Sequence, residues 1–273
     1  MKRSIPHILF LSASISLGLL STAAVGNLIT LMDGNSVVKI DPDPTSTGVK
    51  GVNSWSVNGV NQLQQQWFGY KIGSSTLASI DTLASSGGSM TTTTAAEFPG
   101  IASITYSNTG QGLSINVTYV LTGGSSLDGQ SDLGESIKII NTSTGPQTIH
   151  FIQASNFDLE GTPGGDSLKS SMGFDGKVNA MRQTKGGGLG ASKMETVVTP
   201  AVDLYLPLPL SLPGPDDTGC WFQWDRTIPA GGTFLISQDN LLNVVPEPST
   251  FALLLGAGLG LIGYVWRRRS LGL

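Results

Sequence analysis

The stretch Leu113-Ser-Ile-Asn-Val-Thr-Tyr-Val-Leu121 decides the fold class of this chain. Apolar or aromatic side chains occupy every second position from 113 to 121, and polar side chains occupy positions 114, 116 and 118 between them. A period of two is typical of a β-strand that buries one face. A similar strand begins at Ile104, before the turn sequence Asn-Thr-Gly-Gln-Gly. The region therefore predicts two strands around a turn.

The same design recurs along the chain. Residues 135–153 predict two strands around a Ser-Thr-Gly-Pro turn, and residues 227–237 predict a tight turn that leads into a closing strand. Short strands with turn signals roughly every ten residues favour an antiparallel β-sandwich over a doubly wound sheet. Residues 59–70 are a weak candidate for a helix, and residues 85–99 and 183–192 are expected to be surface loops.

The N-terminal segment is typical of an export signal. Lys2 and Arg3 precede the apolar run from Ile8 to Leu20, and small residues follow at positions 21, 23, 24 and 26. A basic region, an apolar region and a small-residue cleavage zone predict a signal peptide over residues 1–26. The exported body would then span residues 27–243, which is long enough for one β-sandwich domain with its own core.

The C-terminal segment, residues 244–273, predicts a membrane anchor. Residues 245–250 are Val-Pro-Glu-Pro-Ser-Thr, and residues 249–266 carry no formal charge. As a helix, residues 249–266 would span roughly 27 Å, enough for a thin bilayer core. Residues 267–269 are three arginines, which should keep residues 267–273 on the cytoplasmic side.

The order of a Pro-Glu-Pro box, an apolar segment and an arginine cluster resembles the PEP-CTERM sorting signal of Gram-negative bacteria. The resemblance implies recognition by the membrane enzyme exosortase and a final place at the cell surface or in the extracellular matrix. It assigns the sorting motif to three residues and the stop signal to three more, namely Pro246, Glu247 and Pro248, and Arg267, Arg268 and Arg269. In the body, residues 55–73, 133–143 and 156–159 are similar to segments of uncharacterised exported PEP-CTERM proteins, which bring no assigned activity.

Charge and cysteine content exclude several classes of partner. The body keeps 10 of the 15 cations and 18 of the 19 acidic residues, so its net charge is −8. A mildly acidic body without a basic stripe is a poor ligand for nucleic acid or anionic lipid. Cys220 is the single cysteine, so no disulfide can form within the chain.

Catalytic patterns are weak. His150 and Cys220 formally permit a nucleophilic pair, but Cys220 precedes Trp221 in a strand that is expected to be buried. The sequence contains no Gly-x-Ser-x-Gly elbow for serine catalysis. We therefore expect that the protein is not an enzyme.

Two acidic segments are candidates for calcium. Asp41 and Asp43 alternate with prolines before Thr45, and Asp158 and Asp166 lie in a second acidic segment. Carboxylates on alternate residues suit hard cations, but neither segment has the full EF-hand spacing. Asp-Pro and Gly-Gly-Asp are also common turn sequences, so structural turns are the favoured interpretation.

Aromatic residues give the best argument for binding. Trp67 and Tyr70 form one cluster and Trp221 and Trp224 another, each beside amide or charged groups. Strand alternation places Trp221 and Trp224 on opposite faces, so at least one of the two is expected in the core. Exposed rings would stack on sugar faces, as they do in carbohydrate-binding modules.

The resemblance to PEP-CTERM proteins, which occur in bacteria with exopolysaccharide systems, implies an exported protein with a structural or adhesive role linked to exopolysaccharide. The alternatives are a carbohydrate-binding module for one defined sugar and, less favoured, a secreted hydrolase.

Overall fold

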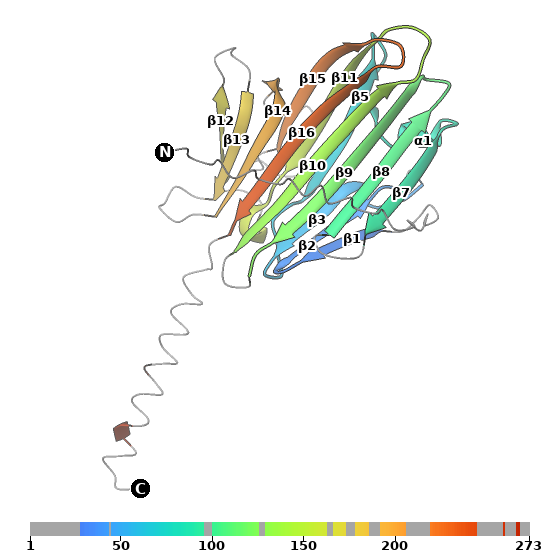
Figure 1. Ribbon diagram of the computed structural model, residues 1–273. Coiled ribbons are helices and arrows are strands. Elements are labelled where there is room, and N and C mark those ends of the chain that lie inside the picture. The colour runs from blue at the N-terminus through green and yellow to red at the C-terminus, as the bar shows by residue number, and fades with distance from the viewer. Residues whose placement is uncertain are drawn as a thin grey trace, which may run out of the picture.

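The computed structural model describes residues 28–43, 45–95, 100–125, 129–162, 166–172, 178–185, 192–205, 219–244, 259 and 266–267. Two antiparallel sheets lie face to face in a sandwich, sheet B in front of sheet A in the view of Figure 1. The mainly β sandwich that the alternating pattern predicts is confirmed. A four-residue helix, α1 (Thr82–Ser85), and a 3-10 turn, η1 (Leu159–Gly161), lie between strands.

Sheet A has the strand order β1-β2-β3-β5-β11-β15-β14, with β4 beside β3 and β6 beside β5. Its strands have these bounds: β1 Ile29–Asp33, β2 Ser36–Asp41, β3 Gly51–Val57, β4 Val60–Asn61, β5 Gln65–Ile72, β6 Ala78–Ser79, β11 Gln147–Asn156 and β15 Gly219–Ile228.

Sheet B has the order β14-β16-β10-β9-β8-β7, with β13 beside β14 and β12 beside β13. Its strands have these bounds: β7 Ser89–Ala95, β8 Gly100–Asn108, β9 Leu113–Gly123, β10 Gln130–Asn141, β12 Asp166–Met172, β13 Val178–Lys185 and β16 Thr233–Asn243. Strand β14 (Lys193–Tyr205) belongs to both sheets, because residues 193–199 pair with β16 and residues 203–205 pair with β15.

The core forms where the apolar faces of the two sheets meet. In β9 every second side chain from Leu113 to Leu121 is buried, as the alternation predicts. Sheet A contributes a row of aromatic rings, in which Phe68 stacks on Phe151 at 5.5 Å between centroids and Phe151 contacts Trp224 at 6.0 Å. Each fully buried apolar side chain of this size stabilises the fold by roughly 2 kcal/mol.

Two of the three predicted turns join strands that do not pair with each other. The turn sequence before Gln147 connects β10 to β11, and the turn before Thr233 connects β15 to β16. Strands β10 and β16 belong to sheet B, whereas β11 and β15 belong to sheet A. The strands are where the pattern predicts them, but the chain crosses from one sheet to the other at both turns.

Two further expectations were wrong. Residues 59–70 form β4 and most of β5 and not a helix, because Gln66, Phe68 and Tyr70 alternate toward the core with a period of two. Residues 89–95, expected within a surface loop, form the edge strand β7, which pairs with β8 over seven residues. Threonine is β-branched and fits a pleated, half-buried strand well.

The predicted signal peptide and most of the C-terminal segment lie outside the described residues. Of that segment, Leu259, Trp266 and Arg267 are helical. Within the part of the chain that the structure describes, no helix is long and apolar enough to span a bilayer. The membrane helix predicted over residues 249–266 therefore stays a prediction.

Candidate functional site

The outward face of sheet A brings together two tryptophans that are far apart in the sequence. Ala154 on β11 pairs with Trp67 of β5 on one side and with Trp221 of β15 on the other. Directly paired residues share a face, and the next residues along, Phe68 and Phe222, point into the core. Trp67 and Trp221 therefore flank a small alanine on the outer face, roughly 10 Å apart at two strand spacings.

A polar row lies further along the same three strands. His150 pairs with Lys71 on β5 and with Asp225 on β15, so these three side chains share the outer face. His150 Nδ1 contacts Asp225 Oδ1, and Gln223 Nε2 donates to the same carboxylate oxygen at 2.9 Å. The side chains of His150 and Asp225 are 25% and 43% exposed, so the row is accessible from solvent.

Between the tryptophans and the polar row lies an apolar strip. Gly69 and Ile152 pair here, and Leu77 lies over Gly69, so that a Cβ added at Gly69 would be 3.2 Å from Leu77 Cδ1. Leu77 is 51% exposed although it is apolar. We call the set Trp67, Ala154, Trp221, Ile152, Gln223, Lys71, His150 and Asp225 the aromatic face. Aromatic and apolar side chains beside a few hydrogen-bonding groups are the usual lining of a small-molecule site.

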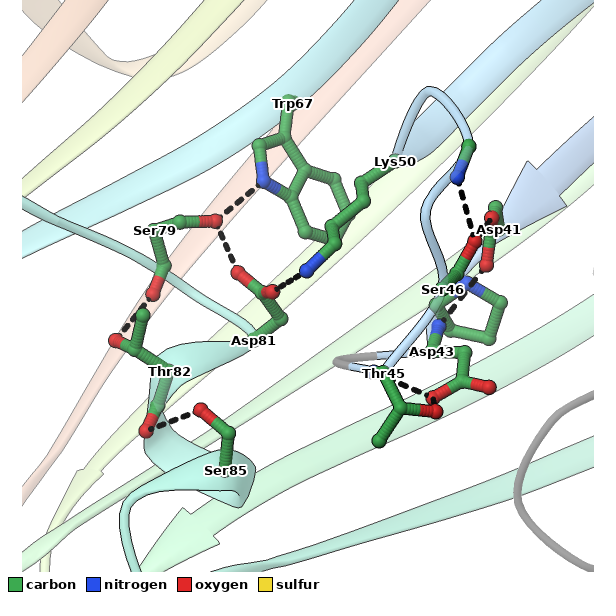
Figure 2. Close-up of polar contacts among 12 residues, drawn as sticks. Asp41, Asp43, Thr45, Ser46, Lys50, Trp67, Ser79, Asp81, Thr82 and Ser85 are labelled. Atoms are coloured by element: carbon green, nitrogen blue, oxygen red, sulfur yellow. Dashed lines mark hydrogen bonds and ion pairs between the residues drawn. The ribbon is translucent and has the colours of Figure 1, made fainter.

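A hydrogen bond at the indole nitrogen holds the Trp67 ring in place. Its Nε1 donates to Ser79 Oγ at 2.6 Å, and the Ser79 hydroxyl donates to Asp81 Oδ1 (Figure 2). Lys50 forms an ion pair with Asp81, whose side chain is only 5% exposed. The Trp67 ring also meets Tyr106 edge-on, at 6.4 Å between centroids.

The other two predicted ligand-binding aromatics lie in the core. Tyr70 is 4% exposed and donates its hydroxyl to Gln111 Oε1 at 2.8 Å. Trp224 is 3% exposed, and its Nε1 donates to the carbonyl of Pro200 at 3.0 Å. Neither ring offers a face to an external ligand in this structure. The predicted separation of Trp221 from Trp224 across the strand is confirmed.

The strand register separates His150 from Cys220. Cys220 pairs with Ser155, whereas His150 pairs with Asp225. Five residues along a strand correspond to roughly 17 Å, too far for a nucleophile and its base to share a hydrogen bond.

The carboxylates of the first acidic segment, Asp41 and Asp43, accept hydrogen bonds within their own turn. Asp41 Oδ1 accepts from the amide of Asp43 at 3.1 Å, and Asp43 Oδ1 accepts from the amide and hydroxyl of Thr45 at 2.8 and 2.7 Å (Figure 2). The bonds from Thr45 lower the pKa of Asp43. These contacts are those of a tight Asx-type turn.

The two acidic segments are not brought together. Asp41 pairs with Gly51 at the start of β3, whereas the amide of Asp158 donates to Gln62 O, and Gln62 lies beside Trp55, further along β3. Asp166 begins β12 in sheet B. Among the described residues, no three acidic, histidine or cysteine side chains are grouped so that they could hold a metal ion.

A buried carboxylate lies between the sheets, and the sequence analysis did not single it out. Glu135 of β10 is 3% exposed, and its carboxylate accepts from Gln153 Nε2 at 3.1 Å, from Asn240 Nδ2 at 3.3 Å and from Gln66 Nε2. Burial raises the pKa of Glu135 to about 8, against the lowering effect of the bonds from Gln66 and Gln153. The only signal in the sequence was its place in phase with Leu133 and Ile137, which are core residues.

A second perturbed acid lies on the outer face of sheet B. Burial, and then a side-chain hydrogen bond and repulsion from Asp239, raise the pKa of Asp132 to about 7. Asp132 and Asp239 lie on the neighbouring strands β10 and β16. Two carboxyl groups that lie close together can share one proton, and this hydrogen bond keeps Asp132 protonated at higher pH.

Comparison with solved structures gives similarities at low identity. The Slr1438 protein from Synechocystis sp. PCC 6803 is 10% identical, with a TM-score of 0.49 over 82% of this chain and 97% of that chain. A galactose mutarotase related enzyme from Lactobacillus acidophilus is 8% identical, with a TM-score of 0.43 over 81% and 99%. The alpha-galactosidase from Lactobacillus brevis is 8% identical, with a TM-score of 0.45 over 80% of this chain and 39% of that chain.

No curated protein matches the chain, and the resemblance of its body segments to other exported proteins stays a prediction. One family model matches, the PEP-CTERM protein-sorting motif, over residues 244–269. The matched range begins directly after β16 and covers the Pro246-Glu247-Pro248 box and the three arginines. This chain therefore carries a PEP-CTERM protein-sorting motif, which implies an exported, surface-directed protein that is sorted by exosortase.

Proposed function

We propose that the sandwich is retained at the cell surface or in the extracellular matrix by binding exopolysaccharide on the aromatic face, without turnover. The observation that carries the proposal is the pairing of Ala154 with both Trp67 and Trp221. The small alanine lies between two indoles, each of which is a flat apolar ring that is only partly buried.

Sugar rings combine apolar C–H faces with a rim of hydroxyls, and the aromatic face has groups for both. The indoles match the C–H faces, while Gln223, His150 and Asp225 offer donors and acceptors to the rim. The body carries a net charge of −8, which disfavours strongly anionic polymers. The proposal is therefore for a neutral or weakly charged polysaccharide.

The test is co-sedimentation of the full-length protein, purified in detergent, with exopolysaccharide isolated from the source organism. We expect saturable retention, which Trp221→Ala reduces at least about 10-fold, as is usual for a central aromatic contact. The control is Leu235→Ala, which removes an apolar side chain that is 60% exposed on the outer face of sheet B. Equal retention of Trp221→Ala and wild type would contradict the proposal, and the assay is run with and without calcium to test the acidic segments.

The hydrolase alternative has one specific observation in its favour. Asp203 of β14 pairs with Gln223, so the backbone register places it one strand away from Asp225. Glycoside hydrolysis requires two carboxyl groups across the scissile bond. Release of reducing ends from the same polysaccharide, lost in Asp225→Asn, would favour an enzyme, whereas retention without product favours the adhesive role.

Delivery to the surface is tested separately. Replacing Pro246, Glu247 and Pro248 together with alanine removes the two prolines that would restrict the box to a backbone that a processing enzyme can grip. We expect an uncut, membrane-held form, seen as slower migration on a gel and loss of release from cells. Identical migration and release of variant and wild type would contradict processing by exosortase at this site.

A further inference from the structure

Trp67 sits at a place where the sheet itself does not fix its ring. Strands β3 and β5 pair at a single position, Val52 with Gln66, so the neighbouring strand supports the indole poorly on that side. Instead the ring lies against the backbone of Gly51, where an added Cβ would be 2.2 Å from Trp67 Cε3. Gly51 also has φ +81°, a conformation that favours glycine.

A chain of polar contacts fixes the indole from its nitrogen end. The indole N–H donates to Ser79 Oγ, the Ser79 hydroxyl donates to Asp81, and Lys50 neutralises that buried carboxylate. Figure 2 shows these four side chains in contact, in the order Trp67, Ser79, Asp81 and Lys50. The carbonyl of Lys50 in turn accepts from Gln65 Nε2 at 2.9 Å, which ties the chain back to β5.

The segment that carries Ser79 is anchored a second time from the core. Thr82 Oγ1 donates to the carbonyl of Ser79 at 2.6 Å and lies 3.2 Å from the Tyr70 hydroxyl. Tyr70 is therefore linked to Trp67 through Thr82 and Ser79, although its own ring is buried. Both anchors restrict the position of the serine oxygen that receives the indole N–H.

We infer that Ser79, Asp81 and Lys50 are positioning residues that hold the Trp67 indole in its binding orientation and thereby set the affinity of the aromatic face for polysaccharide. The inference rests on the proposed function. A side chain that is already in its bound conformation loses less rotational freedom when a ligand binds, so fixing the indole strengthens binding without a new contact.

The experiment combines one structural readout with one binding readout in the full-length protein in detergent. Ser79→Ala removes the acceptor of the indole N–H, Ser79→Thr keeps a hydroxyl, and Ser89→Ala makes the same change on the outer face of sheet B. The indole ¹H–¹⁵N resonance of Trp67 is identified as the one missing from Trp67→Phe. Binding to isolated exopolysaccharide is measured by co-sedimentation.

We expect Ser79→Ala to shift the Trp67 resonance without any ligand present and to weaken binding about five-fold, the size of one hydrogen bond. Ser79→Thr should restore both, and Ser89→Ala should change neither. A shifted resonance with unchanged binding would overturn the positioning role and leave the proposed function intact. Unchanged binding in Trp67→Leu combined with Trp221→Leu would instead overturn the proposed function itself. An unshifted resonance in Ser79→Ala would overturn the positioning role at its first step.

Discussion

The outer faces of the two sheets differ in chemistry although the same alternation builds both. Sheet A carries two tryptophans, an apolar strip and a charged row, drawn from β5, β11 and β15. Sheet B carries a row of hydroxyls across six strands, in the pairing order Thr93, Ser103, Thr118, Ser136, Ser237 and Thr199. The hydroxyl groups of sheet B partly bond to one another, as Thr118 Oγ1 does to Ser103 Oγ at 3.1 Å.

The difference indicates on which of the two faces a ligand gains more binding free energy. Hydroxyls that bond to one another and to water have little to gain from a ligand, because binding exchanges one set of hydrogen bonds for another. Indole rings that remain partly wet gain apolar burial on contact. The two faces therefore make opposite predictions for substitutions of equal size.

The largest effect is expected on stability, at Glu135, which lies between the two sheets. Side-chain amides from both sheets bond to its buried carboxyl group. A folded pKa of about 8 against an ordinary 4.5 corresponds to roughly 5 kcal/mol. The folded state holds a proton on Glu135 that the unfolded state releases above pH 4.5, so the contribution of this group to stability is greatest in acid. It is then lost as pH rises, until about pH 8.

Glu135→Gln should remove most of this loss, because a neutral side chain carries no desolvation cost. Gln66 Oε1 and Gln153 Oε1 are buried without a hydrogen-bond partner, so turned amides could accept from the new glutamine. Denaturant unfolding at pH 5 and pH 8 measures the effect. A variant that loses as much stability between these pH values as wild type would show that Glu135 is ionised in the folded state.

The next largest effect is expected on polysaccharide binding, and it tests the difference between the two outer faces directly. Trp67→Leu with Trp221→Leu keeps an apolar side chain at both positions but removes both flat rings, and we expect at least about 100-fold weaker binding to exopolysaccharide. Thr105→Val with Thr118→Val removes two hydroxyls from sheet B at equal size and should change binding less than about two-fold. Co-sedimentation of both double variants with exopolysaccharide measures the two losses of binding, and melting curves check that both variants are folded. Equal loss in both would place the polymer on sheet B as well.

The smallest effect concerns Asp132 on sheet B. Asp239→Asn removes the neighbouring charge, so the pKa of Asp132 should fall toward its ordinary value. In wild type, the raised pKa of Asp132 causes a loss of stability as pH rises from about 4 to about 7. The variant should lose less stability over this range, and the difference from wild type should be under about 1 kcal/mol after solvent screening. Ser237→Ala, two residues away on β16, is the control for pH-dependent melting. A steeper pH dependence in Asp239→Asn would reverse the assigned cause.

The sequence predicted which residues of a strand face the core better than it predicted which sheet a strand joins. Alternation over residues 113–121 is a local signal, whereas the crossing from β10 to β11 depends on the whole topology. The strand β5 was hidden because Gln66 occupies a core position, where it bonds to Glu135 and breaks the apolar pattern. A polar residue at a buried position has no signature in hydropathy alone.

The candidate site was predicted in its residue types but not in its arrangement. Trp67 and Trp221 were both candidates, yet only the register of β11 places them around Ala154. Ser79 and Asp81 carried no pattern of their own, because their role depends on contacts with Trp67 and Lys50 across the fold. Tyr70 and Trp224 have the same chemistry as the surface rings and differ from them only in the face they occupy.

Strand β16 would have a mechanical consequence for the form that still carries its tail before processing. The sorting motif begins at Val244, directly after this strand, and the amide of Val244 donates to Gly129 O at 2.8 Å. Because β16 lies between β10 and β14, a pull on the tail runs along a strand that is bonded on both edges. Antiparallel hydrogen bonds lie perpendicular to the strands, so the load falls on many of them at once in shear. Drag on the sandwich before the tail is cut would therefore have to break two ladders of hydrogen bonds together.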